Sequence, residues 1–522
     1  MSEVSTRKGH PKGLYVLFFT EMWERFSYYG MRAILVLFMT KMLAFDSKFA
    51  SGIYGNFTAL VYLTPLIGGF IADRYWGNRR SIFVGGITMA IGQFVLFFCA
   101  GSVAGNIDLA KILFVVGLTA LVIGNGLFKP NISTMVNQLY APGDKRVDAA
   151  FSIFYMGINL GAFFSPLICG SLAEKVDYKW GFFAAGIGMS CGLIVFQMLK
   201  NKYIVTADGK QIGEKPSKAV IAPVTPGNDI EPAQPFDEKG ESKAEFSMQR
   251  VFIWLVVYAA LWFVFMHFVG FNWISTLVFA TSITAAGFII TDPTLSKIER
   301  QRIIVIYIAA FFVIFFWSAF EQAGASLTIF ADQQTDRHIL GFEMPASWFQ
   351  SVNPLAIIVL APVFAGIWTS LGKRNREPSS PVKQAIGLFL LSLGYLVIAY
   401  GVQGVTGPMK ASMFWLLGMY ILHTFGELCL SPIGLSMVAR LSPARLASLL
   451  MGVWFLANAM ANDFAGMLSK LYPEAGKSTN FFGFAITSLH DFFMIFVILS
   501  GVAAVILFLL SKMMLRMMNG LR

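Results

Sequence analysis

The stretch LYVLFFTEMWERFSYYGMRAILVLFMT (residues 14–40) decides both the fold and the place to look for a site. As a helix it is long enough to cross the roughly 30 Å core of a bilayer, which takes about 20 mostly apolar residues. It nevertheless carries Glu21, Glu24, Arg25 and Arg32 near its middle. A charge at the bilayer centre costs about 2.5–3.5 kcal/mol on insertion scales, so such residues pair or line a wet cavity. The stretch therefore predicts a membrane-spanning helix that contributes to a functional site.

Apolar stretches of similar length recur along the whole chain. Of the 522 residues, 56% are hydrophobic and 13% are charged, whereas a soluble domain has about 25% charged residues. In lipid, helices satisfy their own backbone hydrogen bonds, and an open sheet edge does not. We predict an all-α polytopic membrane protein with 14 transmembrane helices. The predicted helices lie at about residues 14–40, 52–72, 80–101, 108–130, 148–171, 181–199, 250–268, 271–291, 303–331, 346–370, 383–403, 411–438, 446–469 and 488–511.

The net charge of +11 reports orientation and not a nucleic-acid partner. If the N-terminus is cytoplasmic, the short cytoplasmic segments hold 20 basic residues and the outside segments hold 8. This bias satisfies the positive-inside rule. It predicts a multi-pass protein of the cell inner (plasma) membrane, with both termini cytoplasmic. Of the 40 basic residues, Arg25, Arg32 and Lys129 fall within predicted spans.

The order of the apolar stretches predicts two related six-helix bundles. Residues 200–249 are rich in Lys, Glu, Pro and Gly, as expected of a cytoplasmic linker. The two stretches after it form a predicted inserted hairpin. The predicted units are residues 1–199 (N-terminal bundle), 200–249 (linker), 250–291 (hairpin) and 292–522 (C-terminal bundle).

Matching Gly and Pro positions support a duplication. GNGLFKP (residues 124–130) in the fourth helix and GELCLSP (residues 426–432) in the tenth share their spacing, as do Pro65/Gly69 and Pro362/Gly366. Transporters built from repeats bind substrate at the bilayer midplane between the halves. The duplication therefore predicts a transporter of this design.

The ionisable residues predicted inside the membrane point to one site. On a helix that turns 100° per residue, Glu21, Glu24, Arg25, Tyr28 and Arg32 fall within a sector of about 100°. These residues form either a functional stripe or, as the alternative, a structural cluster in which the acids and bases neutralise one another.

Two further acids, Glu321 and Glu427, lie deep in the second half, and Lys129 faces them from the first. In the repeat alignment Lys129 and Glu427 are one helical turn apart, so the two could form a proton-sensitive gate. A role for His423, one turn before Glu427, is less favoured than a structural one. Asp463 is left without a role.

Several sequence motifs resemble those of the proton-dependent oligopeptide transporter (POT) family. EMWERFSYYG (residues 21–30) resembles its ExxERFxYYG motif, and residues 124–131 and 151–161 are similar to its fourth- and fifth-helix patterns. GGFIADRYWGNRR (residues 68–80) resembles the helix two–three loop of the major facilitator superfamily. The resemblance implies a proton-coupled symporter that imports di- and tripeptides by alternating access.

The resemblance also implies roles for individual residues. Glu21, Glu24, Arg25 and Glu321 would couple protons, and Arg32–Glu321 and Lys129–Glu427 would be gate pairs. The residues implied in peptide binding are Tyr28, Tyr29, Arg32, Tyr62, Lys129, Asn159, Trp317, Asn353, Glu427, Ser431 and Trp454. Arg25 or Arg32 and Lys129 would hold the peptide carboxylate, and Asn159, Asn353 and Glu427 its amino group.

Two other classes of function are the alternatives to peptide import. A proton-coupled carrier of nitrate, an amino acid or another small solute would use the same fold, but the three charges of the ExxER motif and Glu427 favour a zwitterion. A receptor or intramembrane enzyme would need a sensing domain or a catalytic dyad, and HExxH, GxSxG and P-loop patterns are absent from the sequence.

We expect no metal or cofactor. The expected partners are peptides, protons and membrane lipid, and the oligomeric state stays open.

Overall fold

A computed structural model describes residues 9–141, 144, 146–206, 209–215, 247–405, 409–473, 478–481 and 483–520, without the side chains of residues 432 and 444. Helices dominate this part of the chain. The first half contains α1 (Lys12–Lys41), α2 (Ser47–Ile71), α3 (Gly77–Ser102), α4 (Ile107–Gln138), α5 (Val147–Ser165), α6 (Ser171–Lys175) and α7 (Tyr178–Tyr203). The hairpin consists of α8 (Met248–Val264) and α9 (Trp273–Ile290). The second half contains α10 (Lys297–Phe320), α11 (Ser326–Gln333), α12 (Val352–Lys373), α13 (Ser380–Gly401), α14 (Met413–Leu441), α15 (Ala447–Ser469) and α16 (Leu489–Met517).

Short π- and 3-10 segments extend several of these helices. The π segments are η1 (Ala72–Trp76), η2 (Pro166–Gly170) and η3 (Phe265–Val269), and the 3-10 segments are η4 (Glu321–Gly324), η5 (Ala346–Ser351) and η6 (Ala444–Leu446). Segment η4 interrupts the ninth predicted span at Glu321, one of the predicted proton-coupling acids. The interruption therefore places a change of backbone geometry at a predicted functional residue.

Every predicted apolar stretch coincides with a helix, but the number of spans stays a prediction. Eleven segments of the described residues are long and apolar enough to cross a membrane, and one of them, Ser47–Ser102, contains both α2 and α3. Helices α1 and α15 are not among the eleven. Helix α1 carries the four buried charges of the opening stretch, and α15 carries Asn458, Asn462 and Asp463, which lower the mean hydropathy of each helix.

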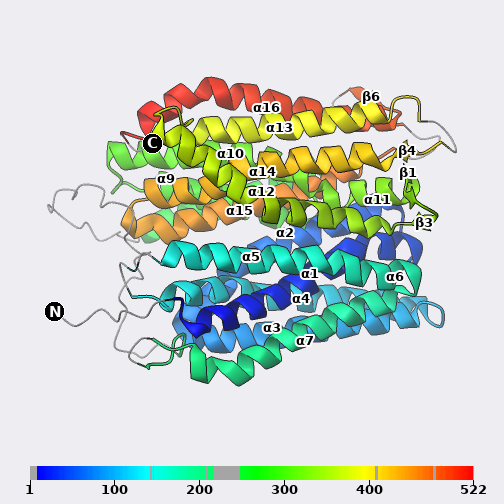
Figure 1. The fold of residues 1–522 in the computed structure, drawn as a ribbon. Coiled ribbons are helices and arrows are strands. Elements are labelled where there is room, and N and C mark those ends of the chain that lie inside the picture. Colours follow the sequence, from blue (N-terminus) through cyan, green and yellow to red (C-terminus); the bar gives the residue numbers. More distant parts are fainter. Residues whose placement is uncertain are drawn as a thin grey trace.

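The helices run roughly parallel to one another in one elongated bundle, with α1–α7 on one side and α12–α16 on the other (Figure 1). Helix α1 packs against α5 and α7, and α3 packs against α4; in the second half α13 packs against α14 and α16. Helices α2 and α15, and α5 and α12, make contacts across the two halves. The proposed division at residues 199, 249 and 291 stays a prediction.

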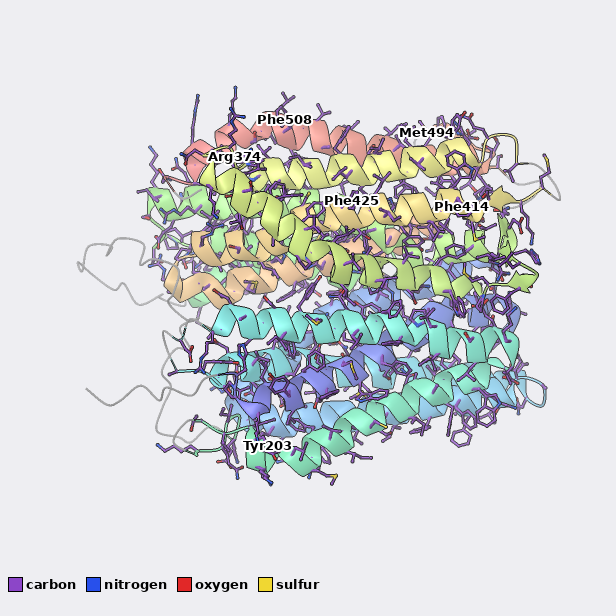
Figure 2. All side chains as sticks on the ribbon, in the orientation of Figure 1. Tyr203, Arg374, Phe414, Phe425, Met494 and Phe508 are labelled. Carbon is purple, nitrogen blue, oxygen red and sulfur yellow. The ribbon has the colours of Figure 1, made fainter. Side chains whose placement is uncertain are left out.

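Helix α1 begins and α16 ends at the same end of the bundle (Figure 1), which we call the inner end. Tyr203 and Arg374 lie toward the inner end, and Phe414 lies toward the opposite, outer end (Figure 2). Residues 216–246 of the predicted linker are outside the described residues, as are Arg7, Lys8, Lys145, Lys477 and Arg522 of the charge count.

Three two-stranded ladders lie at the outer end (Figure 1). Strand β1 (Thr335–Asp336) pairs with β4 (Ala411–Ser412) in parallel, with Thr335 opposite Ala411. Strand β2 (His338–Ile339) pairs with β3 (Phe342–Glu343), and β5 (Thr479–Phe481) with β6 (Phe484–Ile486), both antiparallel. These short ladders close the loops that follow α11, α13 and α15.

Large apolar side chains cover the flanks of the bundle. Phe508 on α16 is 58% exposed and projects from the bundle surface (Figure 2). Val115 on α4 and Val359 on α12 are also exposed. In water such a surface would be a liability, but lipid chains solvate it. The interior is also largely apolar, and it surrounds a smaller set of buried charged side chains that include Arg25, Arg32 and Glu427.

Candidate functional site

The predicted charged stripe of α1 is buried and forms an ion-paired cluster. Arg25 Nε lies 2.8 Å from Glu21 Oε1 and 2.7 Å from Glu24 Oε2. Asn125 on α4 donates a hydrogen bond of 3.0 Å to the other oxygen of Glu24. One guanidinium thus sits between two carboxylates, which neutralises most of the charge within one helix. Asn125 is a site residue that the sequence prediction missed, although it lies one turn before Lys129.

Arg25 and Tyr28 keep donors that no described residue accepts. Arg25 Nη2 and the Tyr28 hydroxyl are buried without a hydrogen-bond partner among the described residues. The Arg25 guanidinium carbon lies 6.0 Å from the centre of the Tyr28 ring. A buried donor without an acceptor costs about 1–3 kcal/mol. A ligand that brings a carboxylate would therefore be favoured here.

Arg32 links the two halves of the protein. Its guanidinium pairs with Glu321 of η4, and both side chains are buried. Arg32 Nε also donates a hydrogen bond of 2.6 Å to the Tyr54 hydroxyl on α2, and Tyr54 is a second residue that the sequence prediction missed. The structure brings this predicted gate pair together, while its role as a gate stays a prediction.

Lys129 has no ionic partner among the described residues. Its ammonium lies 4.2 Å from the centre of the Tyr62 ring, a cation–π contact between α4 and α2. No ion pair joins Lys129 to Glu427 in the described part of the chain. The predicted Lys129–Glu427 gate pair is therefore not formed in this conformation. Lys129 is left as a half-buried cation that is free to bind an anion.

Glu427 lies on α14 and accepts a hydrogen bond from an amide group of its own half. Asn353 on α12 donates a 2.8 Å hydrogen bond to Glu427 Oε2 and lies 3.1 Å from the Thr424 hydroxyl. No cation lies within ion-pair distance of Glu427 among the described residues. Of the three residues predicted to hold the peptide amino group, the structure thus brings Asn353 and Glu427 together, while their role stays a prediction. Thr424 lies beside them, and Glu427 is available to a cationic ligand.

The remaining predicted binding residues occupy several helices. Tyr29 of α1 is half-buried, with the Arg32 guanidinium 5.6 Å from its ring centre. Trp317 of α10 packs edge-on against Phe320 at 5.2 Å, and Trp454 of α15 is buried. Asn159 of α5 donates to the Tyr155 carbonyl of its own helix at 2.9 Å, and Ser431 of α14 is half-buried. For these residues the structure gives a position but no contact that tests their role.

The outer ends of the two halves are joined by contacts that the sequence prediction missed. Glu174 of α6 accepts hydrogen bonds from the backbone N–H groups of Ala346 and Ser347 at 2.7 and 2.9 Å. Because these N–H groups open the helical segment η5–α12, they form a favourable site for an anion. The Lys41 ammonium also pairs with Asp332 at 2.6 Å.

The inner halves of the facing helices are more open than the outer halves. Val363 and Ile367 on the inner half of α12 are exposed, as are Phe151 and Tyr155 on the inner half of α5. Two cavities, of 290 and 300 Å³, lie at the margins of the bundle, and Arg25, Lys129 and Glu427 line neither of them. The conformation is thus closed at the outer end, with facing helices more exposed toward the inner end.

His423 packs as a core residue. Its ring centre lies 4.7 Å from that of Tyr395 and 6.2 Å from that of Phe320. These contacts on two sides agree with the structural role that the sequence analysis favoured, and Glu427 remains the acid that faces the second half's polar groups.

Apolar helices that bury ion-paired side chains between two halves are the arrangement expected of a membrane carrier. Residues 79–484 match the sequence pattern of the POT family. The chain is 37% identical over 470 residues to the peptide transporter YePEPT of Yersinia enterocolitica, which covers 88% of each protein. It is 32% identical over 534 residues to a di-/tripeptide transporter of Lactococcus lactis subsp. cremoris, which covers 98% of each.

A solved structure agrees with these sequence comparisons. A mutant of peptide transporter POT in complex with alafosfalin has a TM-score of 0.78 and 34% identity, covering 98% of this chain and 97% of the other. The chain belongs to the POT family. The family resemblance, the helical carrier fold and the multi-pass membrane character predicted from the sequence are confirmed.

Proposed function

We propose that this protein imports di- and tripeptides together with protons, by alternating exposure of a site between its two halves. The observation that carries the proposal is the distribution of unpaired polar groups. The N-terminal half presents buried or half-buried cationic donors on Arg25 and Lys129, and the C-terminal half presents Glu427 without a cation. A short peptide is a zwitterion, so its carboxylate suits the first set and its ammonium suits the second.

The same arrangement explains why binding would couple to movement. The two termini of one peptide are held by different halves, so occupancy draws the halves together, and a ligand shifts an equilibrium by its differential affinity for the two states. Side chains of varied size would face the aromatic groups of Tyr62, Trp317 and Trp454. Recognition of the backbone termini thus favours broad side-chain selectivity. The relatives named as di-/tripeptide transporters support this substrate class.

The orientation belongs to the same proposal. Both termini would face the cytoplasm, in the cell inner membrane, since basic residues favour that side. The outer end described above would then face away from the cytoplasm. The conformation would be closed to the outside, and a peptide would leave toward the cytoplasm. Protons and membrane lipid are the other proposed partners.

Transport in a purified system provides the direct test. In proteoliposomes with an inward proton gradient, dialanine is expected to acidify the interior and to accumulate, as measured by an internal pH dye and labelled peptide. Free alanine is expected to compete poorly, because a single residue is too short to reach both termini-binding groups. A protonophore and protein-free liposomes serve as controls. Uptake that ignores the pH gradient would contradict symport.

The rival substrates are separated by competition. Di-, tri- and tetrapeptides, free amino acids and nitrate are tested against labelled dialanine in the same vesicles. We expect inhibition by the di- and tripeptides and a clear loss of inhibition at four residues. Equal or better competition by nitrate or by amino acids would favour the alternative carrier on this fold.

Replacement of Glu427 by glutamine tests the amine-binding role. The Asn353 contact can persist with a glutamine, but the charge for a peptide ammonium is lost. A hydrogen bond to a charged group is worth about 1.5–3 kcal/mol, so we expect dialanine to bind about 10- to 100-fold more weakly. N-acetyl-dialanine, which lacks the ammonium, should bind the variant and the parent equally. Equal loss for both ligands would contradict the assignment.

A further inference from the structure

The inserted hairpin touches both halves of the protein. Helix α9 packs against α15 of the second half and also against α2 of the first half. Helix α8 packs against α9, and no residue of α8 is buried. Helix α9 is thus the inward helix of the hairpin, and it lies along the boundary between the two halves, which must change when the halves move. Helix α8 is the outward helix, and it faces lipid.

Helices α2 and α15 approach each other very closely beside α9. A Cβ atom added at Gly55 of α2 would lie 2.6 Å from the Cα atom of Gly466 on α15. Small residues allow such backbone contact between membrane helices. Gly466 lies one turn before the outer end of α15, and Gly55 lies in the third turn of α2. This crossing is therefore part of the outer closure.

Asp463 is buried at this junction and plays no part in the site described above. It is 2% exposed, and its Oδ2 atom has no hydrogen-bond partner among the described residues. Ser275 of α9 faces the carboxyl group. Ser275 is 1% exposed, and its hydroxyl also has no hydrogen-bond partner among the described residues, so the two buried groups lie near each other without a hydrogen bond between them in this structure.

The charges around Asp463 do not neutralise it. Lys470, two turns further along α15, is the nearby cation, but it forms no ion pair with Asp463 within 4 Å among the described residues. From α9 the neighbouring hydroxyl is that of Ser275. From α2 the nearby backbone is that of Gly55, where an added Cβ atom would lie 3.2 Å from the carbonyl oxygen of Asn462. A polar group buried in lipid needs a partner, and the Ser275 hydroxyl is the partner that this junction offers.

The hairpin has a second polar contact, on the α2 side. Asn272 at the start of α9 donates a 3.3 Å hydrogen bond from Nδ2 to Asn56 Oδ1. Both asparagines line the 290 Å³ cavity at the outer margin, together with Lys470. Helix α9 therefore has one polar anchor on each half, Asn56 on α2 and Asp463 on α15.

We propose that the inserted hairpin is a clamp that holds α2 and α15 together at the outer end, with Asp463 as the positioning residue that fixes α9 to the second half. Opening of the outer end separates α2 from α15 and breaks one of the two anchors. The hairpin thereby sets the balance between outward-closed and outward-open states. This inference rests on the alternating exposure of the proposed function, but its readout is a distance and needs no substrate.

The test measures that distance directly. Spin labels are placed through cysteines at Gly105 and Lys410, exposed outer loop positions of the two halves, and the parent without these cysteines gives the background. Asp463→Leu and Ser275→Ala are each expected to raise the outward-open population about five-fold, the typical size of the effect of one polar contact. Asp463→Asn keeps a hydrogen-bonding group and should restore the parent distribution.

Matched controls keep the proposal falsifiable. Ser500→Ala removes a buried, unpartnered hydroxyl of α16, away from the hairpin, and should leave the distances unchanged. Asn56→Ala tests the other anchor and spares the N-cap that Asn272 provides for α9. If Asp463→Leu fails to fold, Ser275→Ala carries the test. Unchanged distances in Ser275→Ala and Asn56→Ala, or an equal shift in Ser500→Ala, would overturn the proposal. A failure of peptide uptake in the parent protein would overturn the proposed function instead.

Discussion

Replacement of Lys129 by alanine is expected to abolish peptide uptake while leaving the protein folded. The ammonium of Lys129 has no ionic partner among the described residues and lies over the Tyr62 ring. In the proposed function it holds the peptide carboxylate, and a charge-assisted contact of this kind is about twice as strong as a neutral one. Dialanine binding should weaken by at least 10-fold, and uptake should fall to the level of protein-free vesicles.

Folding should survive because the deletion leaves no orphaned partner. Removal of one member of a buried ion pair is strongly destabilising, since the other charge stays buried and uncompensated. Lys129 has no such partner, so thermal unfolding of Lys129→Ala should resemble that of the parent. Lys111→Ala on the exposed face of the same helix is the matched control and should transport normally. Normal uptake by Lys129→Ala would remove Lys129 from the site.

The sequence predicts which residues are buried in this site better than it predicts the distances between residues of the two halves. The burial of the α1 stripe follows from helical periodicity, because five polar groups on one face cannot all meet lipid. The contacts of Arg25 with Glu21 and Glu24 are local, between residues one or four positions apart. Local spacing fixes such contacts in any conformation of the protein.

Contacts between the halves depend on the conformational state, which the sequence does not specify. Matching the repeats places Lys129 and Glu427 one helical turn apart. That alignment relates the two bundles to each other and does not give their separation in one conformational state. In the outward-closed conformation the halves meet at Arg32 and Glu321 instead. A predicted gate pair that is open in one state is compatible with a carrier, and its role stays a prediction.

The outer contacts escaped prediction for a different reason. Glu174 lies in a helix of five residues, and its hydrogen-bond donors are backbone N–H groups of a distant segment. The residue types of that segment do not indicate that its backbone N–H groups act as donors. Asp463 was visible as a membrane acid, but its partner belongs to α9, whose packing against α15 no spacing in the sequence indicates.

Replacement of Glu321 by glutamine is expected to uncouple transport from the proton gradient. The Arg32 guanidinium stays protonated under all relevant conditions, so a proton can dissolve the Arg32–Glu321 pair only by binding to Glu321. Loss of that pair frees the halves to separate at the outer end. A glutamine can accept a hydrogen bond from Arg32 but cannot carry the proton, so this step no longer responds to pH.

The consequence is a loss of accumulation, with exchange retained. One proton moving inward gains about 2.3 kcal/mol per 100 mV, which corresponds to roughly 50-fold accumulation for one proton per peptide. Glu321→Gln vesicles should instead only equilibrate labelled dialanine, while exchange of internal for external peptide continues because it needs no net proton movement. Glu21→Gln is the matched comparison, since Glu21 pairs with Arg25 within α1 and does not join the halves. We expect Glu321 to be the coupling acid because only a group that must be neutralised for the halves to part can transmit the gradient to their movement. Full accumulation by Glu321→Gln together with uncoupling by Glu21→Gln would contradict this and would place the driving proton in the α1 cluster.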